Sequence, residues 1–229
     1  MYRDGLTISN NITYQTTFII MKKIILSLAL LAAMSVTFVA CDSKETSDSG
    51  TTEETAGLSD GTMNVDLAAS NVNWEGTMVG MYSHTGDVKL TDGSVVVADG
   101  KITGGSFTVD LNTINPTDEN FDAAKEQTPA KLVGHLSSDD FFAVEKHPMA
   151  TFEITGSDGS TVMGNLTVRG KTNPEEVKNV EIVEADGKVT MTGDLTFDRT
   201  KYDVSFKHPM QEMVVSNDVA MKLKLVANK

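Results

Sequence analysis

The feature that most constrains this chain is a strict alternation of apolar and polar residues in several stretches of its C-terminal half. Phe107, Val109 and Leu111 alternate with polar residues, and the same pattern recurs over 189–198 and 219–225. Successive side chains of a β-strand point to opposite faces, so the pattern predicts strands with one buried and one solvated face. Half-buried strands of this kind are typical of antiparallel sheets.

Turn signals separate these stretches. Asp-Gly pairs occur at 92–93, 99–100, 158–159 and 186–187, and this dipeptide readily adopts the positive φ angles of tight hairpins. We therefore expect each pair to form a hairpin turn. About eight evenly spaced strands predict an all-β fold, either an antiparallel barrel or a sandwich.

One short insertion, near 117–137, has a helical pattern instead. Thr117 can cap a helix that carries Asp118 and Glu119 in its first turn, where acidic residues suit the helix dipole. Thr128-Pro129 then resembles a second N-cap with proline at the first helical position. We expect this insertion to cap or flank the sheet.

The N-terminal region has the pattern of an export signal. Residues 21–40 begin with Met21-Lys22-Lys23 and continue as 17 uncharged residues, which predicts a secretory signal peptide. Residues 1–20 precede this start and are assigned to an upstream start artefact. An uncleaved anchor is an alternative, although 17 residues is short for a span of about 20.

Cys41 directly follows this segment and is the only cysteine in the chain. Val39-Ala40-Cys41 resembles a bacterial lipobox, in which the cysteine is lipidated and becomes the new N-terminus. We therefore expect cleavage before Cys41 and a lipid-anchored protein of the bacterial cell envelope, on the periplasmic or outer-membrane face. Plain secretion is the other alternative. A single cysteine also excludes an internal disulfide and a cysteine-based zinc cluster.

Charge and composition divide the chain after the signal segment into two parts, a tether and a β-domain. Residues 42–60 hold six acidic residues and one lysine among Ser, Thr and Gly, so we expect 41–61 to form a flexible acidic tether. Residues 62–229 form the predicted β-domain. The net charge of −13 without a basic stripe argues against nucleic acid as a partner, because nucleic-acid binding needs clustered Lys and Arg.

Several motifs of the β-domain, in this order, resemble one known family. The matching stretches are His84-Thr85-Gly86, 104–111, 132–152 with His135-Leu136, Asp140-Phe141-Phe142 and His147-Pro148, 164–170 with Thr172 and Pro174, 198–202, and Asp218-Val219. Together they resemble the YceI-like polyisoprenoid-binding family over nearly all of 63–227. The resemblance implies an extended, lipocalin-like antiparallel barrel of eight strands whose lumen holds an isoprenoid chain, such as a quinone or polyprenyl tail. It also implies a periplasmic or secreted protein and a possible homodimer.

The inward-facing apolar residues are the predicted lumen lining. The methionine side chains among them are flexible and adapt to irregular space. Eight strands close a barrel just wide enough for side chains or one slim ligand. Because alternation does not distinguish a lumen from a solid core, an interaction domain with a filled core stays open as an alternative. The predicted lumen residues are Trp74, Phe107, Val109, Phe152, Leu166, Val168, Met191, Leu195, Phe197, Phe206, Met221 and Leu223.

Polar residues offer little chemistry. The chain has four histidines without a metal-binding helical spacing and no nucleophile elbow, so we expect no catalytic residue, no metal and no cofactor other than a bound isoprenoid lipid or quinone. His84 and His135 are the candidates for polar contacts at the barrel mouth. Arg169 and Arg199 are expected on outward strand positions or turns, where a structural salt bridge or a barrel-corner hydrogen bond is the favoured role and a contact to a quinone or phosphate head group is the alternative. The predicted function is a non-catalytic, membrane-tethered lipid carrier; an enzyme acting on a bound lipid is the alternative.

Overall fold

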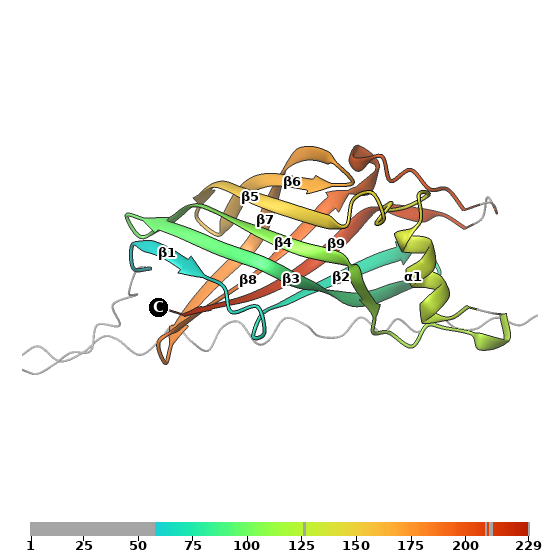
Figure 1. Ribbon diagram of the computed structural model, residues 1–229, viewed down its shortest axis with the longest axis horizontal. Helices are drawn as coiled ribbons and strands as arrows, with labels where there is room; N and C mark the ends of the chain where they lie inside the picture. Colours follow the sequence, from blue (N-terminus) through green and yellow to red (C-terminus); the bar gives the residue numbers. More distant parts are fainter. Residues whose placement is uncertain (1–57, 126, 209, 211–212, 229) are drawn as a thin grey trace, which may run out of the picture. The chain divides into compact units, whose positions relative to one another are not determined.

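The computed structural model (Figure 1) describes residues 58–125, 127–208, 210 and 213–228. The predictions for residues 1–20, the signal peptide at 21–40, Cys41 and the tether up to residue 57 lie outside the described residues. Strands dominate what is described. In chain order the elements are β1 (Gly61–Asn64), β2 (Asn71–Met78), β3 (Tyr82–Ala98), β4 (Lys101–Pro116), the 3-10 turn η1 (Ala123–Lys125), α1 (Pro129–Ser137), β5 (Met149–Asp158), β6 (Thr161–Val168), β7 (Lys171–Ala185), β8 (Lys188–Asp198), the 3-10 turn η2 (Arg199–Tyr202) and β9 (Val215–Asn228).

The sheet closes on itself. Each strand from β2 to β9 pairs antiparallel with the next, and β9 pairs with β2. The short strand β1 pairs with the far half of β3, beyond the part that pairs with β2. The predicted all-β, eight-stranded antiparallel barrel is confirmed. Closure leaves no barrel strand with a free edge, and the barrel lies within a compact unit of its own.

The barrel has two distinct ends (Figure 1). The β3–β4, β5–β6 and β7–β8 turns lie at one end, which we call the hairpin end. At the other, the helix end, lie α1, the β2–β3 turn and residues 203–208. The chain joins the barrel at the hairpin end, where the Asp60 carboxylate accepts a hydrogen bond from the backbone N–H of Gly100 at 3.1 Å.

Three of the four predicted hairpin turns are confirmed. Asp99 and Asp186 have φ angles of 51° and 52°, and Gly159 has a φ of 56°. The turn predicted at 92–93 is wrong, because this pair lies inside β3, next to a register shift between Leu90 and Asp92. A side chain at position 93 would crowd the neighbouring segment, because a Cβ there would lie 3.1 Å from the Cβ of Val65. Glycine allows the two segments to pack closely.

The helical insertion is half confirmed. Helix α1 begins as predicted, with Thr128 as N-cap accepting a hydrogen bond from the N–H of Lys131 at 3.3 Å. No helix begins at Thr117. The Asp118 carboxylate instead accepts from the N–H groups of Thr85 and Asn120, both at 2.9 Å, so the side chain fastens the loop to β3. Within the described ranges, no helix is long and apolar enough to cross a membrane.

Candidate functional site

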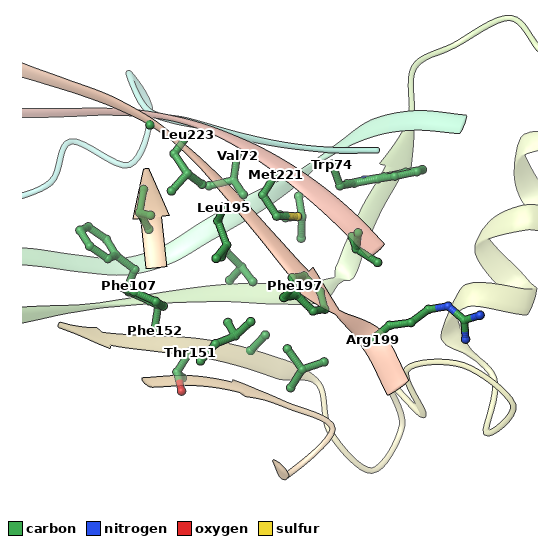
Figure 2. A pocket seen from close by; sticks show the side chains of 18 of the residues that line it. Val72, Trp74, Phe107, Thr151, Phe152, Leu195, Phe197, Arg199, Met221 and Leu223 are labelled. Carbon is green, nitrogen blue, oxygen red and sulfur yellow. The ribbon is translucent and has the colours of Figure 1, made fainter. Parts of the chain in front are cut away.

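The barrel interior is hollow. Val95 and Val189 are fully buried, but other inward side chains that pack against the core cluster are only half-buried. They border an internal cavity of about 210 Å³ (Figure 2). A filled core would bury these positions completely, because protein interiors pack without voids much larger than a water molecule. The half-buried residues are Trp74, Phe107, Val109, Val219, Met221 and Leu223.

Apolar side chains from all eight barrel strands make up most of the cavity wall. Every predicted lumen residue except Phe206 lies in this wall, and their contact with a ligand stays a prediction. Figure 2 shows Met221 beside Trp74 and Leu195, with which it pairs across β2 and β8. The polar side chains in the wall are Thr77, Thr151, Thr192, Arg199, Ser216 and Asp218.

Two glycines let aromatic rings lie against the wall instead of filling the lumen. Gly86 on β3 pairs with Trp74 on β2, and a Cβ on Gly86 would collide with the indole ring. The indole Nε1 donates to the backbone carbonyl of Asp87 at 3.1 Å, which fixes the ring in this position. Gly164 on β6 lies under the ring of Phe152 in the same way. The lumen therefore keeps its width at positions that carry its largest side chains.

A second cavity, of about 250 Å³, lies at the helix end. It shares lining residues with the lumen, among them Trp74, Leu136 and Phe141, so the two voids adjoin. His84 and His135 both line it, and their contact with a ligand head group stays a prediction. Phe206 also lines it and not the lumen, because the segment before β9 does not continue as an inward-facing strand. The remaining lining residues are Gly76, Thr77, Met78, Tyr82, Gln127, Leu132, His208, Met213 and Val215.

His84 is held in place by the 117–122 loop. Its Nδ1 lies 3.0 Å from the Asp118 carboxylate, and its ring stacks on Phe121 with a centroid separation of 4.7 Å. Burial opposes ionisation of Asp118, but hydrogen bonds from the N–H groups of Thr85 and Asn120 and from His84 outweigh it and lower the Asp118 pKa. The carboxylate therefore anchors both the loop and the histidine.

We expect Asp118→Asn to lower the free energy of unfolding at neutral pH by about 1–2 kcal/mol, because charge-assisted hydrogen bonds are replaced by weaker ones. A carboxyl whose pKa is lowered by folding stabilises the fold fully above its ordinary pKa of 3.8. That contribution disappears as the pH falls through the lowered value. Urea titrations from pH 7 to pH 2 should show the difference between wild type and variant shrinking below pH 3.8. A difference that does not change with pH would contradict this assignment.

His135 on α1 sits among aromatic rings. Its ring makes edge contacts with Phe206 and Phe141, at centroid separations of 4.4 and 5.5 Å. Burial lowers the pKa of His135, the proximity of His208 lowers it further, and Asp140 opposes the shift. His135 thus favours the neutral form and adds to an apolar mouth. Among the described residues, no group of three or more His, Cys, Asp or Glu side chains is arranged to hold a metal ion.

Arg199 lies in the turn η2 and is buried, where an outward position would leave it exposed. It is only 3% exposed, and its guanidinium donates to the backbone carbonyls of Val204, Val215 and Ser216 at 2.6, 3.3 and 2.8 Å. The guanidinium also lies 5.7 Å from the ring centre of Phe141. Arg199 therefore closes the corner between β8 and β9 at the helix end, beside the lumen (Figure 2).

Arg169 holds a second corner of the barrel by hydrogen bonds to backbone carbonyls, as Arg199 does. It has a φ of 51° at the β6–β7 turn and donates to the carbonyls of Asp139, Phe141 and Asp203, all within 2.8 Å. A salt-bridge or barrel-corner role was the expectation for both arginines, but the sequence does not indicate which carbonyls they bind, since an arginine at a strand end usually faces water. The two side chains together tie the loops that surround the barrel mouth.

Residues 63–227 match the family model described as the YceI-like domain. The chain belongs to the YceI-like family. This YceI-like chain is similar to a UPF0312 protein of Staphylococcus aureus, with 33% identity over 85 residues, which are 34% of this chain and 48% of that protein. It also resembles a UPF0312 protein of Pseudomonas aeruginosa, with 43% identity over 56 residues, or 23% of this chain and 29% of that protein. The matched part thus spans about half the length of the first relative and less of the second.

Comparison with solved structures gives matches to most of the described residues. The crystal structure of BcnA from Burkholderia cenocepacia matches with a TM-score of 0.57 and 22% identity, covering 72% of this chain and 99% of that chain. A polyisoprenoid binding domain from Saccharophagus degradans, implicated in plant cell wall breakdown, matches with a TM-score of 0.49 and 14% identity over 72% of this chain and 97% of that chain. The likeness to BcnA agrees with the closed barrel described above.

Proposed function

We propose that this chain is a non-catalytic carrier that sequesters a polyisoprenoid, or a similar long-chain amphiphile, in the barrel lumen. The observation that carries this proposal is the apolar lumen, which adjoins the mouth cavity at the helix end. Together the two voids reach the volume range of small-molecule sites, about 300–1,000 Å³. Membership in the YceI-like family supports the same class of ligand.

The energetics fit a chain-like ligand. Burying one five-carbon isoprene unit is worth roughly 3–4 kcal/mol gross, at about 0.8 kcal/mol for each carbon group. Ordering the chain offsets part of this gain. Several units in a preformed lumen therefore bind tightly without a polar contact to the tail. Trp74 and Phe152 lie flat on the wall and leave the lumen axis to such a chain.

The wall supports binding and not catalysis. Its Thr and Ser hydroxyls come without a partnering base in the described hydrogen bonds, and Arg199 is engaged by three carbonyls. His84 and His135 lie in the mouth cavity, one held by Asp118 and the other packed among rings. Neither is placed beside a nucleophile in the described part of the chain.

The proposed setting is the bacterial cell envelope. Support comes from the sequence alone: a signal peptide at 21–40, the lipobox-like Val39-Ala40-Cys41 and an acidic tether. Lipidation of Cys41 would anchor the carrier stably when two or more acyl chains are attached. Homodimer formation, implied by the resemblance, is part of the same proposal.

The test uses both the native protein and its single tryptophan. Chain purified from its own host and extracted with organic solvent should release an isoprenoid or similar lipid, identified by mass spectrometry. Added isoprenoid quinone should quench the fluorescence of Trp74, because this residue lines both cavities and is the only tryptophan. Repeated preparations without an apolar ligand, together with no quenching, would exclude the carrier function.

A further inference from the structure

An exposed apolar surface lies at the helix end of the barrel. Val79 and Met81 in the β2–β3 turn are 53% and 56% exposed, and Met210 and Val214 before β9 are 54% and 53% exposed. We call these four residues the methionine lip. The N–H of Val79 donates to the carbonyl of Val214 at 2.8 Å, which joins the two segments into one surface. Large apolar side chains gathered in this way mark an interaction site.

The lip continues the apolar surface of the mouth cavity. Met78, Tyr82 and Met213, adjacent in sequence to lip residues, line that cavity. The cavity in turn adjoins the lumen through Trp74. Residues 76–82 contain no charged side chain. An apolar route therefore runs from the lumen, past the mouth, to the outer surface.

We propose that the methionine lip docks the barrel mouth on an electrically neutral lipid bilayer, where the ligand enters and leaves. This inference rests on the proposed function. A long isoprenoid chain is expelled by water in proportion to its apolar area, so it exchanges most readily where the mouth meets a membrane. Unbranched methionine side chains adapt to a fluid acyl layer.

The charge around the lip identifies the kind of bilayer. The 117–122 loop, whose exposed acid is Glu119, lies beside the start of β3, with the Asn120 side chain donating to the carbonyl of Ser83 at 2.8 Å. Lys207, three residues before Met210, is a single exposed lysine and not a basic cluster. Membrane-binding surfaces that prefer anionic lipids carry clusters of Lys and Arg next to the apolar contact. The acidic loop at this position favours a zwitterionic surface over an anionic one.

The test compares a lip variant with a matched control in residues 58–229. The lip variant is Val79→Asp with Met81→Asp. The control is Val183→Asp on β7, close to the hairpin end, where the side chain is 59% exposed. Flotation with phosphatidylcholine vesicles measures docking, and quenching of Trp74 by vesicle-borne quinone measures transfer. Circular dichroism confirms that each variant is folded.

We expect wild type and control to bind the vesicles alike, and the lip variant to lose at least tenfold in both vesicle binding and transfer rate. Quinone added from detergent should bind all three proteins equally. Adding phosphatidylglycerol to half the lipid should weaken wild-type docking. Three results would overturn the inference: vesicle binding by the lip variant equal to that of wild type, stronger wild-type docking on the anionic vesicles, or no docking by wild type. The last result would assign the lip to a protein partner. If quinone from detergent binds none of the proteins, the carrier function fails and not only the docking surface.

Discussion

Replacing Met221 with tryptophan is expected to weaken the binding of a long isoprenoid quinone by about a hundredfold while the barrel stays folded. Met221 lies on β9 between Trp74 and Leu195, and its side chain is only half-buried because it borders the lumen. A larger ring there occupies the space of about one isoprene unit. Burial of one isoprene unit contributes roughly 3–4 kcal/mol gross to binding. Losing this contribution is partly offset, because the excluded segment of the ligand no longer has to be ordered.

Fluorescence would be ambiguous in a variant with two tryptophans, so the measurement is equilibrium binding of a radiolabelled or native quinone followed by mass spectrometry. Lys222→Trp is the matched control, because it lies next in the same strand and is exposed on the outer face. It should bind the quinone like wild type. Leu223→Trp, a second inward position, should repeat the loss. Unchanged affinity in both inward variants would show that the ligand does not occupy the lumen.

Replacing Arg199 with methionine should have the largest effect on stability. The variant leaves the carbonyls of Val204, Val215 and Ser216 without their donor at a position that is 3% exposed. Unsatisfied buried acceptors cost about 1–3 kcal/mol each, so we expect a loss of about 3 kcal/mol or more. For a domain of this size the melting temperature then falls by about 6–12 °C.

Lys201→Met provides the control for this change. Lys201 lies two residues away in η2, and its ammonium is half exposed beside Glu175 at 3.6 Å. Exposed ion pairs contribute about 0–1 kcal/mol, so the control should melt within a few degrees of wild type. Arg199→Lys retains the charge without the fork of donors and should fall between the two. If thermal unfolding of Arg199→Met matches that of the control, the corner is not held by this side chain.

The barrel itself was predictable because its signals are local. Alternation placed residues such as Phe107, Leu166 and Met191 on the inner face, since the two-residue period of a strand needs no tertiary information. Asp-Gly pairs identified most hairpins for the same reason. The exception at 92–93 shows the limit: the same dipeptide can relieve crowding inside a strand when a neighbouring segment, here Val65, packs closely on it.

The mouth was less predictable because it is built from long-range contacts. Asp118 seemed suited to a helix N-terminus by its spacing, yet it binds Thr85 and His84, more than 30 residues earlier in the chain. Arg199 follows a polar strand position and was expected at an outward position or a turn. Its burial depends on three carbonyls presented by a segment that comes later in the sequence. No periodicity encodes such pairings.

The place where the described chain enters the barrel lies opposite the opening. Asp60 contacts the hairpin end, whereas the mouth lies at the helix end. Strand β3 alone, 17 residues long, measures about 55 Å. A label or surface attached on the N-terminal side of Asp60 therefore meets the barrel about one strand length away from its opening.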